Sequence, residues 1–417
     1  MDRFGNPIDP AAGFARGAFL ASPTEDAMRM RHGLDVIRQR ALDHGAGSIG
    51  IFTGNRRDLL LREGDLALAE EWIGPALYTP ALDAAIRAHL DAPPDAASFV
   101  FNRGSAALVA SMLALAPQGR VISVVPEGSR SHPSLRRGAM LAGAAFEEIG
   151  GVAELLATLA GKPASLLVVT TVTSSLARLA DADIANAIVL GHGAGIPVLL
   201  DDAYGARIRT VLHGGASGFA LGADLVVTNA DKAGLPGPRA GIMAGNARMM
   251  AGITATASLI GMEARAPISL GVLRGLEAWS PAELLHEAAQ GLALADALTG
   301  RLGAVVQRTD LGPLISPEDV LTIACARAGI DTPPIVPVEA TALLGMLLME
   351  RHGMLTTNIA GQPGSHPALR LKPAGPALER CGGVEAVAAA VDRELDAVAG
   401  LLGAPAEICG MLLGRER

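Results

Sequence analysis

The chain has 417 residues, of which 50 % are hydrophobic and 18 % charged, and its formal net charge is −8. This composition excludes a disordered polyampholyte, and the acidic balance argues against a nucleic-acid partner. The cysteines Cys325, Cys381 and Cys409 form no CxxC pair, which argues against a disulfide scaffold or a metal site. No apolar run reaches the roughly 20 residues that span a bilayer, and no signal segment is visible. We therefore expect a cytoplasmic protein without a membrane partner.

The pattern of predicted secondary structure changes near residue 97. Residues 1–50 mix glycine, proline and charge, which predicts an arm with one helix near 25–44, and residues 64–91 predict an interrupted helix. Beyond residue 97, short apolar strands alternate with helices, a pattern typical of a mostly parallel sheet covered on both faces. The predicted strands are 98–101, 121–125, 165–170, 197–201, 224–228 and 240–244, and the predicted helices are 104–115, 133–142 and 183–191.

Long helices dominate from about residue 276. They are predicted at 281–302, 338–349 and 384–402, with short β-like runs at 304–307 and 369–371. We therefore expect three parts: an N-terminal arm (1–50), a large domain (51–275) and a smaller C-terminal α+β domain (276–417).

Lysine is rare in this chain. The 34 basic residues include only Lys162, Lys232 and Lys372, and arginine supplies the rest. A lysine retained in such a chain marks a position where a primary amine is useful, since a guanidinium cannot form a Schiff base, although chance explains the survivors equally well. We expect Lys162 and Lys372 to be solvated, whereas Lys232 follows a predicted strand end.

Other polar side chains also follow predicted strand ends. Asp201 ends one strand, 31 residues before Lys232, and Gly104 and His132 each lie between a strand and the next helix. Ligands in open α/β sheets bind beyond the carboxyl ends of the strands, so these residues are candidates for one site. Each of these residues, taken alone, also has a structural explanation. Asp201 would be a helix cap, Lys232 a surface lysine, Gly104 part of a Gly-Ser N-cap, and His132 a helix-entry histidine.

In this order, the residues resemble a phosphate cup, a ring-stacking residue, a ring-nitrogen carboxylate and a Schiff-base lysine, as in the fold type I pyridoxal phosphate (PLP) enzymes. Asp231-Lys232 followed by Gly237-Pro-Arg-Ala-Gly241 resembles the selenocysteine synthase-like group. Phe101-Asn-Arg-Gly-Ser105 and Asp201-Asp-Ala-Tyr-Gly-Ala-Arg207 are similar to its archaeal-type members, whose reaction is undefined. The resemblance covers roughly residues 95–275. It implies the α/β PLP-dependent transferase fold, with a mostly parallel seven-stranded sheet and a smaller C-terminal α+β domain.

The resemblance also implies roles for individual residues. Lys232 would form the Schiff base with PLP and act as the base at the substrate α-carbon, and His132 would stack on the ring. Asp201 would pair with the pyridine nitrogen, with its neighbour Asp202 as the alternative. Tyr204 or Asp202 would contact the phenolic oxygen of the ring. The other implied cofactor ligands are Arg103, Gly104, Ser105, Thr173 and Asn229, the last at a position where relatives often carry a small hydroxyl residue.

Two arginines are candidate substrate ligands. Arg370, in Pro367-Ala-Leu-Arg-Leu-Lys-Pro373, resembles the C-terminal arginine that holds the substrate α-carboxylate in many of these enzymes. Arg239, in the loop after Lys232, would bind a phosphate of the substrate or of a neighbouring subunit. For both, a solvated surface arginine is the alternative.

The expected function is that of a PLP-dependent transferase or lyase. We favour β-elimination or β-replacement on a serine-like substrate, with or without a phosphate. The alternatives are an aminotransferase, a Cα–Cα condensing or cleaving enzyme and, in another class, a catalytically silent binding protein on this fold. A nicotinamide dehydrogenase lacks support, because no early strand–GxGxxG–helix is present. The expected partners are a small amino-acid substrate and a second copy of the chain, in a homodimer or a larger even assembly.

Overall fold

The structure is a computed structural model that describes residues 1–360 and 366–415. It consists of two compact units, which are called here the first unit (Met1–Asn55 with His286–Arg417) and the second unit (Arg56–Leu285). Residues 1–50, expected as an arm, belong to the first unit together with the C-terminal residues. Along the described ranges, no helix combines the length and the apolar character needed to cross a membrane.

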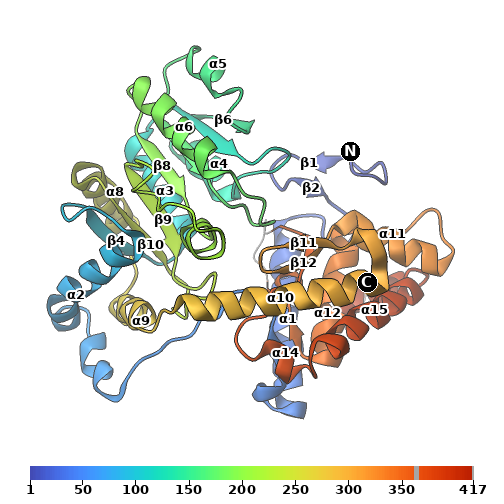
Figure 1. Cartoon of the computed structure of the whole chain (residues 1–417). Helices are drawn as coiled ribbons and strands as arrows, with labels where there is room; N and C mark the ends of the chain where they lie inside the picture. Colours follow the sequence, from blue (N-terminus) through green and yellow to red (C-terminus); the bar gives the residue numbers. More distant parts are fainter. Residues whose placement is uncertain (361–365, 416–417) are drawn as a thin grey trace. The chain divides into compact units, whose positions relative to one another are not determined.

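The second unit is built on the mostly parallel sheet expected from the sequence, in the order β4-β10-β9-β8-β7-β5-β6 (Figure 1). Its strands from β6 to β9 run parallel, and β10 is antiparallel to both of its neighbours. The strands are β4 (Ala97–Phe101), β5 (Arg120–Val125), β6 (Ala145–Gly150), β7 (Leu166–Thr170), β8 (Val198–Asp201), β9 (Leu225–Asn229) and β10 (Gly241–Gly245).

Helices cover both faces of this sheet. Neighbouring side chains of a strand point to opposite faces, so strands that are apolar throughout present apolar side chains on both faces, and each face is buried by helices. Leu199 packs on the face covered by α3 (Gly104–Leu115), α4 (Pro133–Leu141) and α8 (Ala247–Leu259), which is called the α3 face below. Leu200 packs on the other face, under α2 (Ile73–Leu90), α6 (Asp181–Gly193) and α9 (Ala266–Glu277). By the same alternation, Asp201 at the end of β8 lies on the α3 face. The remaining short elements are η2 (Glu63–Ala69), α5 (Leu155–Leu159), α7 (Gly205–Arg207) and the π-helix η3 (Ile208–Leu212).

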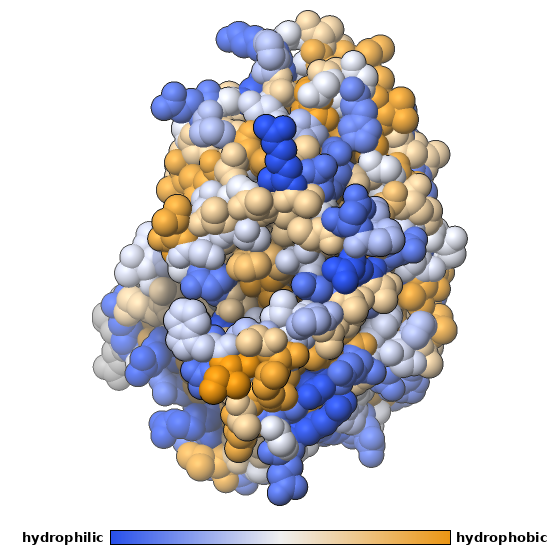
Figure 2. All heavy atoms as spheres, turned by 90° about the vertical axis from the view of Figure 1, so that its left-hand side faces the viewer, coloured by the Kyte–Doolittle hydropathy of each residue, from blue (hydrophilic) through white to orange (hydrophobic). Residues whose placement is uncertain are grey.

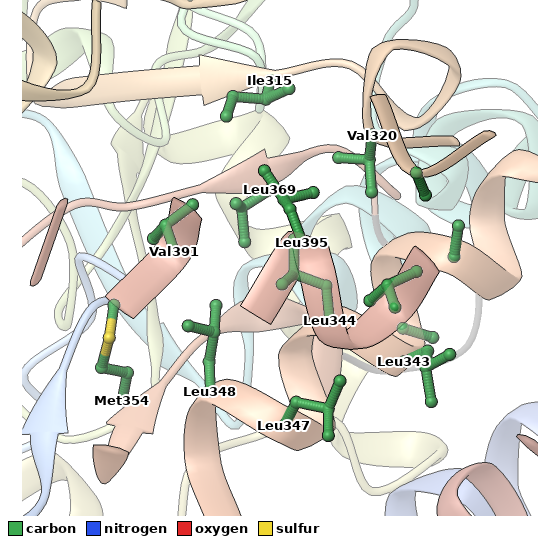
Figure 3. Packing of buried hydrophobic residues seen from close by; sticks show 14 of the residues in the cluster. Ile315, Val320, Leu343, Leu344, Leu347, Leu348, Met354, Leu369, Val391 and Leu395 are labelled. Atoms are coloured by element: carbon green, nitrogen blue, oxygen red, sulfur yellow. The ribbon is translucent and has the colours of Figure 1, made fainter. Parts of the chain in front are cut away.

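The first unit packs around α12 (Pro337–His352), whose Leu343, Leu344, Leu347 and Leu348 lie in one core (Figure 3). The expected β-like run 304–307 is wrong for its first residues, which form a 3-10 turn (Gly303–Val305) before β11 begins at Gln307. The other helices include α1 (Pro23–His44), α10 (Pro281–Leu302), α11 (Pro317–Ala328), α13 (Thr357–Ala360), α14 (Ala377–Arg380), α15 (Val384–Leu401) and α16 (Pro405–Leu413). The strands are β1 (Ile8–Asp9), β2 (Phe14–Ala15), β3 (Gly50–Ile51), β11 (Gln307–Thr309), β12 (Gly312–Ile315), β13 (Met354–Leu355) and β14 (Leu369–Arg370), and η1 is Ala46–Ser48.

Candidate functional site

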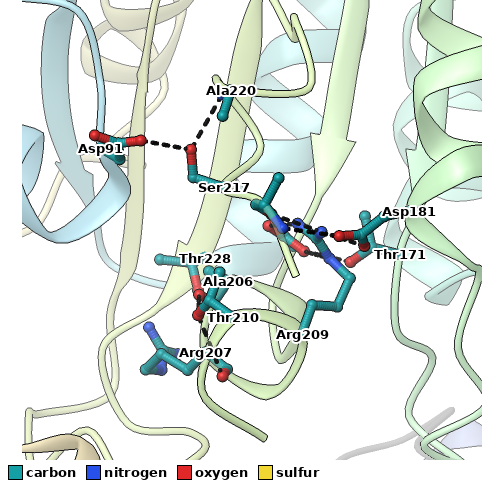
Figure 4. A network of polar contacts seen from close by, with 12 residues as sticks. Asp91, Thr171, Asp181, Ala206, Arg207, Arg209, Thr210, Ser217, Ala220 and Thr228 are labelled. Atoms are coloured by element: carbon teal, nitrogen blue, oxygen red, sulfur yellow. Dashed lines mark hydrogen bonds and ion pairs between the residues drawn. The ribbon is translucent and has the colours of Figure 1, made fainter. Parts of the chain in front are cut away.

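The acidic pair at the end of β8 splits into two different environments. The Asp202 and Arg209 side chains are both 0 % exposed, and Nη2 of Arg209 donates to Oδ2 of Asp202 at 2.9 Å. Arg209 also donates to Asp181 at 2.8 Å (Figure 4). The Thr171 hydroxyl donates to Asp202 as well. The carboxylate of Asp202 is therefore committed to a buried ion pair.

Asp201 is also buried, but no arginine or lysine of the described residues forms such an ion pair with it. Desolvation raises the pKa of its carboxyl to about 6, and the nearby positive charge of Lys232 opposes that rise. Its neighbour across the sheet is Thr170 on β7, whose buried Oγ1 has no hydrogen-bond partner in the described part of the chain. A ligand that brings a cationic N–H to this edge of the sheet would stabilise the carboxylate of Asp201.

Lys232 lies three residues beyond β9, and its side chain is half-buried. Its Nζ lies 4.4 Å from the centroid of the Tyr204 ring, which is itself buried, so the aromatic face supports the ammonium by a cation–π contact. The charge of Lys232 also acts on the pKa of Asp201 and of His132. The lysine, the carboxyl and the imidazole thus share one electrostatic environment.

His132 is the N-cap of α4, and its Nδ1 accepts a hydrogen bond from the backbone N–H of Ser134 at 3.2 Å. Although the residue is exposed, desolvation and the positive charges of Lys232, Arg103 and Arg137 lower its pKa to about 3. The imidazole is therefore neutral, with its proton on Nε2. Capping uses the ring edge at Nδ1, so the helix-entry role and a stacking role are compatible.

The N-terminus of α3 meets the end of β9. Arg103 is the N-cap of α3, and the side chain of Asn229 lies over Gly104, where an added Cβ would come within 2.8 Å of Asn229 Oδ1. Ser105 follows in the first turn, whose N–H groups lack partners within the helix and can bind a phosphate. A larger residue at position 104 would displace the Asn229 side chain, and the expected phosphate residues Arg103, Gly104, Ser105 and Asn229 are brought together.

Two expected ligands are engaged elsewhere. Thr173 is buried in the loop after β7, and its hydroxyl lies 2.8 Å from that of Ser175. Arg370 lies in the first unit on β14, where its Nη2 donates to the Thr357 hydroxyl at 3.3 Å. Arg370 is buried rather than solvated, and its role toward a substrate carboxylate stays a prediction.

Three arginines surround the carboxylate of Asp231, the residue before the lysine. Nε of Arg57 lies 3.3 Å from Oδ2 of Asp231, which is buried. Desolvation, followed by the positive charges of Arg57 and Arg103, lowers the pKa of Arg239 to about 10, while Asp231 opposes this shift. Arg57 contacts the carboxylate of Asp231, whose charge also acts on Arg103 and Arg239, which makes this arginine cluster (Arg57, Arg103 and Arg239) a candidate anion site.

The sequence suggested no role for Arg57 or Arg207, although Arg207 ends the segment Asp201–Arg207 that carries part of the resemblance. Arg57 has a left-handed backbone with φ 56°, and no periodic element surrounds it. Arg207 ends the three-residue helix α7, and its guanidinium bonds to backbone carbonyls of the Lys232 loop. The described residues contain no group of His, Cys, Asp and Glu side chains arranged to hold a metal ion.

No family model matches the chain. It is 35 % identical over 355 residues to a UPF0425 pyridoxal phosphate-dependent protein of Methanothermobacter thermautotrophicus, covering 84 % of this chain and 88 % of the relative. A second protein so named, from Methanosphaera stadtmanae, is 28 % identical over 345 residues, with 83 % and 88 % covered.

Solved PLP enzymes share the fold. Serine palmitoyltransferase from S. paucimobilis aligns with a TM-score of 0.60 and 17 % identity, covering 88 % of this chain and 98 % of the enzyme. N-succinyldiaminopimelate aminotransferase from Mycobacterium tuberculosis aligns with a TM-score of 0.57 and 16 % identity, with 87 % and 96 % covered. These likenesses confirm the expected fold type I architecture, and at such identities they carry the fold alone.

Proposed function

Because this chain belongs to the family of UPF0425 pyridoxal phosphate-dependent proteins, we propose that it is an enzyme in which Lys232 holds PLP and acts on an amino acid. The observation that carries the proposal is the shared environment of Lys232 and Asp201, an amine and a buried carboxyl at neighbouring strand ends on one sheet edge. This pair supplies both chemical requirements of the cofactor, a primary amine and an anion for its ring nitrogen.

The described residues fit PLP. The carboxyl of Asp201 lacks an arginine or lysine ion pair, and the unpartnered Thr170 hydroxyl lies on the adjacent strand, so a pyridinium N–H has a place to bind. The first turn of α3, which begins at Gly104 without a side-chain cap bond, has N–H groups that would bind the cofactor phosphate. When bound, PLP supplies an electron sink that makes the substrate α-carbon acidic.

The side chains around the proposed cofactor site have different roles in the reaction. Nζ of Lys232 would take the proton from the substrate α-carbon, and the Tyr204 ring would support the resulting ammonium. The neutral His132, fixed by its cap bond to Ser134, offers a ring face and an Nε2–H that bring no added charge. Asp202, held by Arg209, fixes the backbone that presents Asp201.

The reaction that we propose is β-elimination or β-replacement on a serine-like amino acid whose leaving group is a phosphate. The arginine cluster supports this choice, because it presents more positive charge beside Lys232 than Asp231 balances. Guanidinium groups suit phosphate because of their planar, bidentate geometry. Transamination, which a buried Arg370 permits, and Cα–Cα chemistry are the alternatives. The narrower likeness to the selenocysteine synthase-like group and a cytoplasmic location rest on the sequence alone.

The arginine cluster predicts that Arg57→Ala and Arg239→Ala act on the phosphorylated substrate selectively. With O-phospho-L-serine, we expect each variant to lose roughly 10–100-fold in kcat/KM, the usual value of a charge-assisted hydrogen bond, and with L-serine to lose little. The assays are release of pyruvate, ammonia and inorganic phosphate from the PLP-loaded enzyme.

Other outcomes of this assay would overturn parts of the proposal. Equal losses with both amino acids would assign the cluster to the cofactor phosphate. Keto-acid formation without phosphate release would favour an aminotransferase. Bound PLP without turnover of any amino acid would favour the silent binding protein.

We also propose that the chain forms a homodimer through the face that carries α2. Trp72 is 84 % exposed, and Leu66, Ile73 and Leu77 beside it are exposed as well. Figure 2 shows hydrophobic side chains grouped on this face of the molecule. Exposed apolar side chains that gather on one face are typical of an interaction surface.

The proposed interface predicts a change of mass in solution. The double variant Trp72→Ser, Ile73→Ser should shift the protein from dimer to monomer in size-exclusion chromatography with light scattering. The control Leu259→Ser changes an exposed leucine on α8 and should leave the dimer intact. A wild-type monomer, or a dimer that survives the double substitution, would contradict the assignment.

A further inference from the structure

One buried guanidinium holds both ends of the segment that carries Lys232. Arg207 is buried at the end of α7, and its Nη2 donates to the carbonyl of Asn229 at 2.7 Å. Its Nε donates to the carbonyl of Lys232 itself at 3.1 Å. Figure 4 shows this side chain on the short helix beside Ala206 and Thr210. Asn229 is the last residue of β9, so the clamp ties the strand end to the lysine.

The partners of Arg207 are neutral. Besides the two carbonyls, Nη2 reaches the carbonyl of Ala203 at 3.5 Å, and Nη1 lies 3.0 Å from Nε2 of His89 on α2. Desolvation, with a smaller effect of Arg207, lowers the pKa of His89 to about 3, so this imidazole is uncharged and accepts at Nε2. Desolvation lowers the pKa of Arg207 to about 10, against the more distant charges of Asp202 and Asp231, neither of which forms an ion pair with Arg207 in the described part of the chain. A buried cation whose direct partners are neutral stabilises a fold poorly. A positional role explains the arrangement better.

The turn after Lys232 needs such a restraint. Ala233 has φ 48° and Gly234 has φ 75°, so two consecutive residues are left-handed, and the first of them is a buried alanine. A non-glycine residue in this conformation is held there by its surroundings. The carbonyl of Lys232 accepts from Leu235 N–H at 3.2 Å as well as from Arg207, so both bonds brace the strained turn.

We propose that Arg207 is a positioning residue for Lys232. It braces the Lys232-Ala233-Gly234 turn from the carbonyl side and so keeps Nζ above the Tyr204 ring. Tyr204 and Arg207 lie at the two ends of one short segment, which therefore presents both the surface under the ammonium and the clamp on its backbone. The inference rests on the proposed function, since it describes how Lys232 is presented to PLP.

The test compares Arg207→Met and Arg207→Lys with Arg274→Met in full-length protein mixed with PLP. Arg274 is a largely buried arginine of the same unit whose hydrogen bonds go to Asp65 and Glu277. One readout is the rate at which borohydride-reducible cofactor accumulates on Lys232, followed by peptide mapping. The others are the pH midpoint of the visible absorbance band and the melting temperature.

We expect Arg207→Met to slow attachment about tenfold or more and to move the pH midpoint by about one unit, with Arg207→Lys between it and the wild type. Arg274→Met should lower the melting temperature and change neither of the other readouts. Adding Ala233→Gly, which relieves the left-handed turn, should restore part of the attachment rate of Arg207→Lys.

A lower melting temperature with an unchanged attachment rate and pH midpoint in both Arg207 variants would overturn the inference. The Arg207→Lys variant keeps the charge, so it decides the matter if Arg207→Met does not fold. Failure of the proposed function is distinguishable, because the wild type itself would then carry no reducible cofactor on Lys232.

Discussion

Replacing Lys232 by alanine is expected to abolish covalent attachment of PLP and to reduce turnover by about a thousandfold or more, because both the attachment point and the base at the α-carbon are lost. The wild type should show a yellow absorbance band, and borohydride should fix the cofactor on the peptide that contains Lys232. In K232A, PLP should still bind, held by the phosphate and ring contacts, but it should be removed by gel filtration.

Lys162 provides the matched control. It lies exposed after α5, far along the chain from the strand ends that form the site, so K162A should keep the band and the labelled peptide. A reducible band that persists in K232A would place the cofactor on another amine. A colourless wild type that does not take up added PLP would contradict the central proposal.

Replacing the adjacent residues Asp201 and Asp202 by asparagine is expected to change the free energy of unfolding in opposite directions. Asp201→Asn should stabilise the cofactor-free protein at pH 7.5 by up to about 3 kcal/mol, whereas the gain at pH 4 should stay below about 1 kcal/mol. Burial raises the pKa of Asp201 from 3.8 to about 6, so the folded state holds this proton more tightly than the unfolded state. The contribution to stability is complete below the unfolded pKa and is lost as the pH rises through 6. Asparagine carries no charge and faces the unpartnered Thr170 hydroxyl.

Asp202→Asn should do the reverse. It leaves Arg209 without its fully buried partner, which costs about 3–5 kcal/mol at pH 7.5. Denaturant unfolding of the cofactor-free variants at the two pH values measures both effects. Asp201→Asn should at the same time weaken PLP binding at least tenfold, because the ring nitrogen loses its anion. Equal destabilisation by Asp201→Asn at both pH values, or PLP affinity equal to that of the wild type, would refute the assignment of Asp201.

Much of the second unit could be predicted because its strands are apolar throughout. Strands buried on both faces, such as 166–170 and 225–229, are apolar except at their carboxyl ends, which makes them stand out in the sequence, and the helix Gly104–Leu115 was predicted to the residue. The edge strand β6 was missed, since Ala145–Gly150 carries two glutamates and half of its residues are exposed, as in many edge strands.

The candidate site was predictable only where residues follow strand ends in order. Lys232, Asp201 and His132 met that condition, and the structure gives them one environment. Arg57 and Arg207 lie in a loop and a three-residue helix, where no periodicity marks a position. The prediction that Lys372 is solvated is wrong, since its side chain is 2 % exposed, and a single sequence gives no sign that a cation is enclosed by the packing of its unit.

The scarcity of accessible amines has a practical consequence for the chemistry of an aldehyde cofactor. Free PLP reacts with any unprotonated primary amine, and in lysine-rich proteins such adventitious adducts obscure the specific one. Here Lys372 is enclosed, and Lys162 is the exposed competitor among the lysine side chains. Arginine elsewhere on the surface keeps its charge but does not capture the aldehyde. Non-specific adducts of PLP with lysine side chains are therefore limited to Lys162. In the K162A variant, titration with PLP would report the stoichiometry of the specific site with little interference from other lysine side chains.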